Sequence, residues 1–211
     1  MSQLNLFPTE EQSIPKVGLL LAVFPEEHAA HSIYKLQANL RCKHGLCETL
    51  RPPNHLHISV PCLGNARGSL TQVIQSVAIA CQAATETTPP FEVTFERVLS
   101  FKGKPMEQAL VLLGRKDENT ELRALHRRLV AELSDRTDVN PKFTPHITLL
   151  YGREIHEEPI NPAISWRVSE IVLVLSHRGA TKYDRLGCWK LGTSNNFSNA
   201  ILPPRDLSQL V

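Results

Sequence analysis

Apolar residues follow two different spacings along this chain, and the two spacings alternate. Short continuous or alternating apolar stretches are typical of strands, whereas apolar residues three or four positions apart are typical of helices. The first spacing predicts strands at residues 17–24, 57–63, 91–95, 109–113, 146–151, 166–175 and 182–191. The second predicts helices at residues 26–40, 69–84 and 119–133.

Turn-forming residues set the expected boundaries of these elements. Gly64 and Asn65 should end the strand that starts at His57, and Ser69 should cap the second helix, whose apolar face includes Ile79. Residues 135–144 should form a loop. The last two predicted strands should form a hairpin around Gly179.

The order of the elements contains a repeat. A strand, a helix and a strand that begins at His57 come first, and the strand 109–113, the helix 119–133 and a strand that begins at His146 repeat this order. We therefore expect an α+β fold with two pseudo-symmetric lobes. Each lobe should be a mainly antiparallel sheet with outer helices, and the two histidine strands should line a central groove.

Two similar tripeptides open the two histidine strands. They are His57-Ile58-Ser59 and His146-Ile147-Thr148. Residues i and i+2 of a strand point to the same face, so each tripeptide should present one imidazole beside one hydroxyl and turn its isoleucine into the core.

Such a set of groups suits a reaction at a phosphoryl centre. Imidazole can donate or accept a proton near neutral pH, and hydroxyl groups can bind phosphoryl oxygens. From the residues alone, either histidine could be the acid and either the base. Histidine-containing tripeptides also arise by chance in a chain with nine histidines, so the surrounding residues have to support the assignment.

Composition narrows the class of protein. The net charge of +2 gives no strong field for nucleic acid, and no apolar run is long enough to span a membrane. Residues 1–16 lack the basic start and apolar core of a secretory signal, and five scattered cysteines suit reduced thiols, so we expect a cytoplasmic protein. Cys42 and Cys47 should lie in a loop, and a metal site that uses His55 and His57 is a minor alternative.

Around the two tripeptides the chain resembles a known family, the two-histidine phosphoesterases. Residues 53–60 (PNHLHISV), followed by Leu63-Gly64, resemble the first signature, and residues 143–149 (FTPHITL) closely resemble the second. Residues 19–25 and 183–191 are similar to the edges of the bacterial RNA 2',3'-cyclic phosphodiesterase branch, long called 2'-5' RNA ligases. The resemblance runs from about residue 17 to residue 192.

This resemblance implies metal-independent hydrolysis of RNA 2',3'-cyclic phosphate ends to 2'-phosphates, with the reverse 2'-5' joining in some members. It implies His57 as general acid and His146 as general base, with Ser59 and Thr148 binding the phosphoryl oxygens. No cofactor or metal is implied, and the expected partners of a monomer are RNA ends or small cyclic nucleotides. The chain departs from the branch at residues 60–62 and at residues 151–153, where Tyr151-Gly152-Arg153 replaces a stretch in which that branch often has a basic residue directly after the second motif.

Two other classes of function stay open. One is a module that binds RNA ends without catalysis, and the other is a phosphodiesterase for another small cyclic nucleotide. Phe24 and Tyr183 are candidates for stacking a base, and Arg178, Lys182 and Arg185 could steer a nucleic-acid end, although a solvated charge cluster is the simpler interpretation. His55 should lie on the surface, and the solvated histidines should be His28, His31, His126, His156 and His177.

The two ends of the chain differ in composition from its body. We expect a flexible tail at residues 1–15, a bilobal domain at residues 16–192 and a C-terminal tail at residues 193–211. Gln3-Leu4-Asn5-Leu6-Phe7 resembles the short peptide with which bacterial proteins bind the replication sliding clamp. The alternative is an apolar segment that folds back onto the body.

Overall fold

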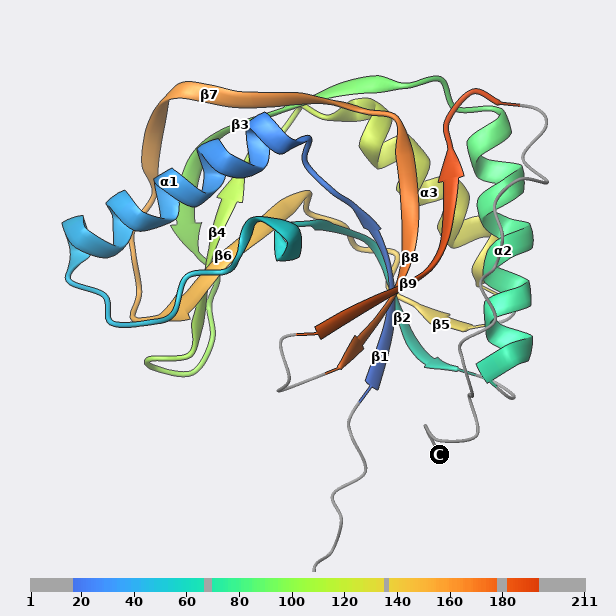
Figure 1. The fold of residues 1–211 in the computed structure, drawn as a ribbon, viewed down its shortest axis with the longest axis horizontal. Helices are drawn as coiled ribbons and strands as arrows, with labels where there is room; N and C mark the ends of the chain where they lie inside the picture. The colour runs from blue at the N-terminus through green and yellow to red at the C-terminus, as the bar shows by residue number, and fades with distance from the viewer. Residues whose placement is uncertain (1–16, 67–69, 135–136, 178–181, 194–211) are drawn as a thin grey trace, which may run out of the picture.

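The computed structural model describes residues 17–66, 70–134, 137–177 and 182–193. Two sheets form the frame (Figure 1). The first has the strand order β5-β2-β1-β8-β9 and the second the order β6-β4-β3-β7. The strands of the first sheet are β1 (Val17–Val23), β2 (Ile58–Ala66), β5 (Thr137–Val139), β8 (Glu170–His177) and β9 (Lys182–Lys190). The strands of the second are β3 (Phe91–Ser100), β4 (Gln108–Leu113), β6 (His146–Gly152) and β7 (Glu158–Val168).

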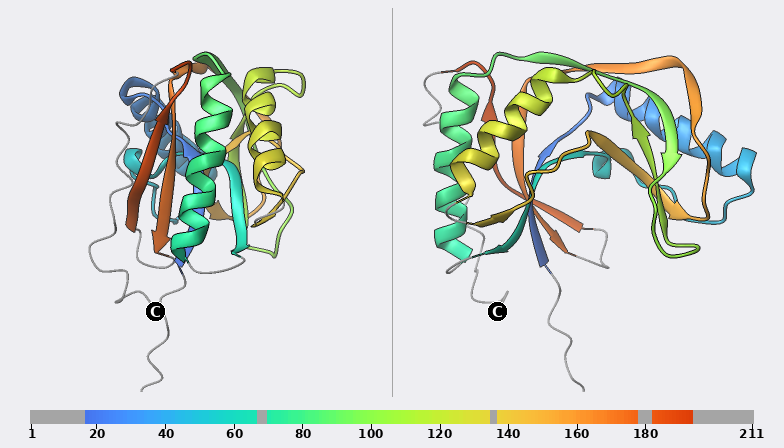
Figure 2. Two further views of the ribbon diagram at one scale, coloured as in Figure 1. Left: turned by 90° about the vertical axis from the view of Figure 1, so that its right-hand side faces the viewer. Right: turned by 180° about the vertical axis from the view of Figure 1, so that it is seen from behind.

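Helices cover the outer side of each sheet. They are α1 (Glu27–His44), α2 (Leu70–Glu86) and α3 (Thr120–Leu133), with a short 3-10 helix, η1 (Pro53–His55), before β2. Figures 1 and 2 show α2 and α3 at one end of the molecule and α1 at the other, with the two sheets between them. Neighbouring strands of the described residues pair antiparallel. The expected α+β fold of two antiparallel sheets with outer helices is confirmed. No helix of the described chain is long and apolar enough to cross a membrane.

The helix of each repeat packs against the sheet of the other repeat. Helix α1 follows β1 of the first sheet but contacts β7 of the second. Helix α3 follows β4 of the second sheet but packs mainly against β2 and β5 of the first, with a smaller contact to β3. An ion pair between Lys43 Nζ and Glu158 Oε2, 2.6 Å long, joins the end of α1 to β7. This exchange makes one continuous buried apolar cluster out of residues from both sheets.

One predicted strand is wrong, because residues 166–175 belong to two strands in two sheets. Trp166 lies opposite Val93 in the second sheet, whereas Val172 lies opposite Ala22 in the first. The chain crosses between the sheets at Ser169, and both segments are buried, so the apolar pattern continues across the crossing. The antiparallel pairing of β8 with β9 is confirmed, while Gly179 lies outside the described residues.

Other boundaries shift because strands extend along their neighbours. Strand β2 continues past Gly64 and Asn65 to Ala66, which lies opposite Thr137 of β5, so the predicted loop at 135–144 contains a short strand. Strand β3 continues to Ser100 opposite Leu110, and β7 begins at Glu158. In α2, Ile79 is 60% exposed and does not belong to the apolar face. Ser69, the predicted N-terminal tail and all of the predicted C-terminal tail except Thr193 lie outside the described residues.

Candidate active site

His57 and His146 occupy equivalent positions in the two sheets. His146 is the first residue of β6, and His57 directly precedes the first residue of β2. The predicted alternation holds in both strands, because Ile58 and Ile147 are buried in the core. The two histidines, with Ser59 and Thr148, are partly exposed on the opposite faces. Strands β2 and β6 contact each other, so the fold brings the two tripeptides together.

A bulge follows the hydroxyl residue in each histidine strand. Between the pairs Ala22–Ser59 and Leu20–Cys62, β2 has one residue more than β1. Between the pairs Val111–Thr148 and Leu110–Leu150, β6 likewise has one residue more than β4. Bulges bend a strand and change the direction of its side chains, and they are common beside active sites. The repeat therefore extends from the motifs to the backbone that positions them.

Both imidazoles are held in the same way. His57 Nδ1 lies 2.9 Å from the carbonyl oxygen of His55, and His146 Nδ1 lies 2.7 Å from the carbonyl oxygen of Thr144, two residues back in each case. A carbonyl accepts only, so each Nδ1 carries the proton that it donates. Each neutral ring then keeps a lone pair on Nε2, where it can accept a proton from a ligand or return one.

Burial favours the neutral form of both histidines in the free protein. Burial above all, together with the charges of Arg51, His146 and His55, lowers the pKa of His57 to about 4, against the raising effect of the hydrogen bond to the His55 carbonyl. Burial also lowers the pKa of His146, against the hydrogen bond to Thr144. The effect of His146 on His57 places the two imidazoles within electrostatic reach of each other.

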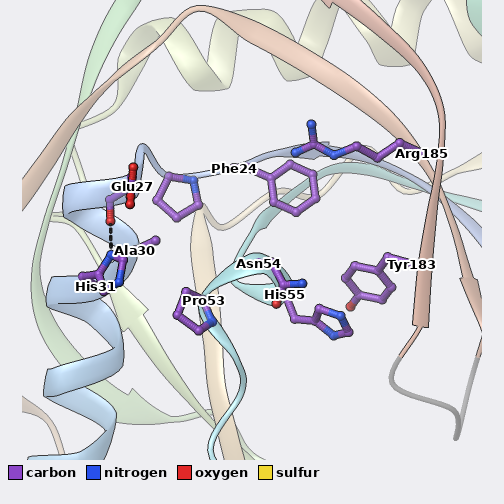
Figure 3. A pocket seen from close by; sticks show the side chains of 10 residues that line it. Phe24, Glu27, Ala30, His31, Pro53, Asn54, His55, Tyr183 and Arg185 are labelled. Atoms are coloured by element: carbon purple, nitrogen blue, oxygen red, sulfur yellow. Dashed lines mark hydrogen bonds between the residues drawn. The ribbon is translucent and has the colours of Figure 1, made fainter.

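An aromatic pocket of about 420 Å³ is lined by Phe24, His55 and Tyr183 (Figure 3). The ring of Tyr183 stacks on His55, with centroids 4.4 Å apart, and meets the edge of His57 at 5.5 Å. Phe24 lies 5.9 Å from His57 and carries the guanidinium of Arg185 4.8 Å above its ring. The structure thus brings together both residues that the sequence suggested for base stacking. It also corrects the prediction for His55, which is only 8% exposed and belongs to η1 rather than to a strand face shared with His57.

The sequence did not identify Arg51, a charged residue close enough to His55 and His57 to affect their pKa values. The side chain of Gln37, fully buried in α1, accepts a hydrogen bond from the Arg51 backbone N–H at 3.0 Å and donates one to its carbonyl at 3.1 Å. The Arg51 guanidinium lies 5.5 Å from the centre of the Tyr151 ring, and its charge lowers the pKa of both His55 and His57. A basic residue just before the first motif was the only available signal.

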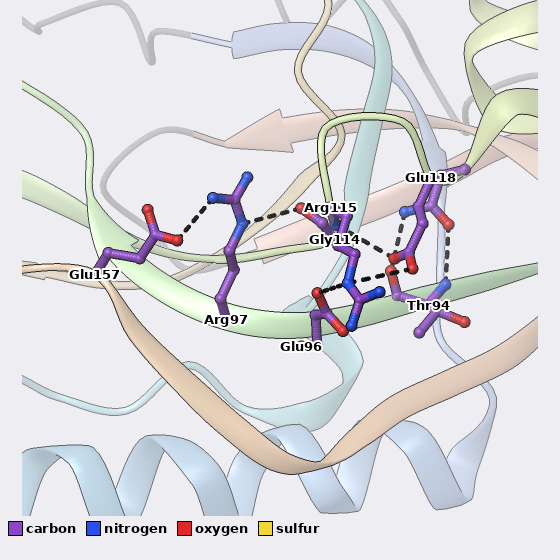
Figure 4. Close-up of polar contacts among 8 residues, drawn as sticks. Thr94, Glu96, Arg97, Gly114, Arg115, Glu118 and Glu157 are labelled. Carbon is purple, nitrogen blue, oxygen red and sulfur yellow. Dashed lines mark hydrogen bonds and ion pairs between the residues drawn. The ribbon is translucent and has the colours of Figure 1, made fainter.

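Arg97 and Arg115 line another pocket, which also includes Thr144 and Pro145. Both arginines pair with carboxylates (Figure 4). Arg97 donates to Glu157 Oε1 at 2.8 Å and to the carbonyl of Gly114. Arg115 donates to Glu96 Oε1 at 2.5 Å. These contacts join β3 to the loop between β4 and α3 and to the segment just before β7, so their role is structural.

Two of the histidines expected in solvent have defined partners. His126 is 3% exposed and stacks on Phe143 with ring centroids 4.3 Å apart. His177 Nε2 lies 2.6 Å from Asp184 Oδ2 across the hairpin of β8 and β9. Both predictions were wrong because the partner comes from another element. Within the described ranges, no three His, Cys, Asp or Glu side chains are grouped so that they could hold a metal ion.

Comparisons with solved structures concern the fold. The crystal structure of E. coli LigT complexed with 3'-AMP is 22% identical and covers 83% of this chain and 98% of its own, with a TM-score of 0.64. A crystal structure of a phosphoesterase is also 22% identical, over 83% of this chain and 99% of its own, with a TM-score of 0.65. TT0787 of Thermus thermophilus is 20% identical, over 84% of this chain and all of its own, with a TM-score of 0.62.

No curated protein sequence matches the chain. The model of one family does, over residues 22–180, a range that contains both histidine motifs, both bulges and the aromatic residues around His57 other than Tyr183. The family is described as the 2'-5' RNA ligase superfamily. Since the match covers well over half of the chain, this protein belongs to the 2'-5' RNA ligase superfamily.

Proposed function

We propose that this protein hydrolyses 2',3'-cyclic phosphate ends of RNA to 2'-phosphates, without a metal ion. The observation that carries the proposal is the matched pair of hydrogen bonds at the two histidines. Each Nδ1–H donates to a carbonyl two residues back, which leaves one Nε2 on each lobe for proton transfer. Two such groups from opposite sheets suit a reaction that needs an acid and a base at once.

The proposed step attacks the cyclic phosphate with water. One histidine removes a proton from the water as its oxygen bonds to phosphorus, and the bond between phosphorus and the ribose 3' oxygen breaks. The other histidine donates a proton to that departing oxygen. Ser59 and Thr148 donate hydrogen bonds to the non-bridging oxygens, where negative charge increases in the transition state. The same step with a 5'-hydroxyl in place of water as the nucleophile would form a 2'-5' linkage, and the ribose 3' oxygen would again leave as a hydroxyl.

The assignment of His57 as acid and His146 as base, implied by the resemblance, requires help from the substrate. With its pKa lowered to about 4, His57 is neutral near pH 7 in the free protein. A phosphodiester carries a negative charge, and a negative charge close to an imidazole favours the protonated form. Substrate binding would therefore supply the protonated histidine that the step needs.

The aromatic pocket is the proposed site of the nucleoside next to the cyclic phosphate. Phe24 and Tyr183 lie 5.9 Å and 5.5 Å from the His57 ring by their centroids, so a base bound there would place its ribose near the imidazoles. Asn54 and Arg185 line the same pocket and provide polar groups for the base or the ribose.

Turnover of an oligoribonucleotide with a 2',3'-cyclic phosphate end, measured in EDTA, tests the proposal. Wild type should form only the 2'-phosphate product. His57→Ala and His146→Ala should each lower kcat by about 100-fold or more, because each removes one proton-transfer group. His156→Ala is the matched control, since His156 is exposed and outside both motifs, and it should keep full activity.

Three results would contradict the proposal. The first is activity that EDTA removes, and the second is full activity in either motif variant. The third is a wild type that binds the cyclic-phosphate RNA but does not convert it, which would favour a binding module or a different cyclic nucleotide.

A further inference from the structure

We propose that Arg51 binds the phosphoryl anion of the ligand. The inference rests on the proposed function for the identity of the ligand but not for the existence of an anion site. It assigns a role to a residue outside both histidine motifs. The contacts, burial and surroundings of Arg51 carry it.

The backbone of Arg51 is fixed independently of its side chain. Gln37 Oε1 accepts the Arg51 N–H, and Gln37 Nε2 donates to the Arg51 carbonyl. Gln37 has no exposed surface. Its side-chain amide makes both of these hydrogen bonds to the backbone of Arg51, so it holds that backbone in one position. The loop between α1 and η1 is therefore a rigid support for the guanidinium.

The guanidinium itself lacks an anionic partner. Its Nε is buried and has no hydrogen-bond partner among the described residues, and none of their carboxylates lies within ion-pair distance of it. The carboxylate of nearby Glu48 instead lies against Gly152. Arg97 and Arg115, by contrast, are paired with glutamates. Partial burial of an unpaired cation costs free energy, which an anionic ligand would offset.

The position of the guanidinium connects the two lobes. It lies over the ring of Tyr151 in β6, the strand that begins with His146, and its charge also reaches His57 at the start of β2. Tyr151 stands in the stretch after the second motif in which the bacterial branch often has a basic residue. Here a ring occupies that position and supports a cation that comes from another segment. A guanidinium binds phosphate oxygens through two parallel hydrogen bonds, which suits this role.

Arg51 would also link phosphate binding to protonation. In the free protein its positive charge disfavours the protonated form of His57. A phosphoryl anion bound at Arg51 would offset that charge and attract a proton to the imidazole. The other charged or titratable groups that act on His57 are His146 and His55, and both disfavour the protonated form.

Binding of adenosine 2'-monophosphate, measured by calorimetry at fixed ionic strength, tests the proposal without turnover. Arg51→Gln should weaken binding roughly 10- to 100-fold, because it removes a charge-assisted pair of hydrogen bonds. Arg51→Lys should weaken it less, since it keeps the charge. Arg153→Gln is the matched control and should bind like wild type, because Arg153 is exposed and donates to the carbonyl of His44. Adenosine without phosphate should bind all variants equally.

The pKa of the His57 ring, followed by NMR, gives a second measurement. Arg51→Gln should raise the pKa of His57 in the free protein, and adenosine 2'-monophosphate should raise it less in the variant than in wild type. Unchanged affinity in Arg51→Gln, or an equal loss in Arg153→Gln, would overturn the proposal. Because the Gln37 contacts use only backbone atoms of Arg51, the substitution leaves the loop supported.

The same variants separate this proposal from the proposed function. Normal turnover of the cyclic phosphate with affinity that does not depend on Arg51 would overturn the role of Arg51 alone. Affinity that depends on Arg51, in a wild type that does not convert the cyclic phosphate, would overturn the proposed function and leave the anion site intact.

Discussion

The protonation of His57 and His146 sets the pH dependence of the proposed reaction. The step needs one proton on the histidine pair, on the acid and not on the base. In the free protein the pKa of His57 is about 4 and that of His146 is below its usual 6.5. As pH rises above these values the pair loses its last proton, and as pH falls below them it gains a second.

We therefore expect kcat/KM to be highest at an acidic pH and to fall as pH rises through neutrality. The kcat/KM profile reports the free protein and the kcat profile reports the complex, in which the substrate anion raises both pKa values. The alkaline limb of kcat should thus lie at higher pH than that of kcat/KM. Steady-state rates across the range from acid to mildly alkaline pH at constant ionic strength measure both limbs. A kcat/KM that stays constant from mildly acidic to mildly alkaline pH would contradict a protonated histidine in the reaction.

The residue scale also shows what the sequence could and could not reveal. The alternation of His57 and Ser59 with buried Ile58 follows from strand geometry, so the pairing of imidazole with hydroxyl could be predicted. The position of Arg51 depends on a buried amide in α1 and on Tyr151 in β6, contacts that only the folded chain creates. A charged residue in a loop gives no sign of such neighbours.

At the scale of elements, one side chain joins the start of α3 to β3. Asn119 has a left-handed backbone with φ of 59°. Its Oδ1 accepts the N–H of Thr94 at 2.9 Å, and its Nδ2 donates to the Thr94 carbonyl at 3.0 Å. The contact is tight, since a Cβ at Gly114 would lie 2.6 Å from Asn119 Nδ2.

Asn119→Gly should lower the free energy of unfolding by about 2 kcal/mol, because it removes two hydrogen bonds from a partly buried backbone. Met106→Gly is the matched control, since Met106 has the same left-handed backbone, with φ of 66°, but an exposed side chain. Glycine accepts this backbone without strain, so the control should be neutral or slightly stabilising. Urea unfolding measures both. Equal effects of the two substitutions would show that backbone conformation, not the Asn119 side chain, decides stability here.

A helix or strand could be predicted where its apolar residues all pack against a single sheet. The helix at residues 119–133 was found within one residue, because its apolar stripe faces one sheet. The junction of β7 and β8 was not, because Trp166 and Val172 are both buried but pair in different sheets. Apolar spacing records burial, and it does not record which sheet provides the partner.

At the scale of the whole molecule, the exchange of helices between the repeats decides how the protein unfolds. Helices α1 and α3 pack mainly against the sheet of the other repeat, and one buried cluster includes residues of both sheets. Each of these two helices would lose most of its packing surface if the sheet of the other repeat unfolded. The internal repeat was visible in the sequence, but this exchange was not. The apolar face of a helix would be buried equally well against the sheet of its own repeat or against that of the other repeat.

We therefore expect the two sheets to unfold in one cooperative transition, and the two tryptophans of the chain report on them separately. Trp166 lies in β7 of the second sheet, where it stacks on Phe95 at 5.2 Å, and Trp189 lies in β9 of the first. Trp189→Phe leaves a probe of the second sheet, and Trp166→Phe leaves a probe of the first.

Each substitution can change the urea concentration at which the variant is half unfolded. The comparison is therefore made within each variant, between its unfolding curve from tryptophan fluorescence and its curve from far-ultraviolet circular dichroism. Coincident curves in both variants are the expected result, since each probe then follows the whole secondary structure. A fluorescence transition that precedes or follows the dichroism transition in either variant would mean that the lobes unfold independently and that the exchanged helices do not couple them.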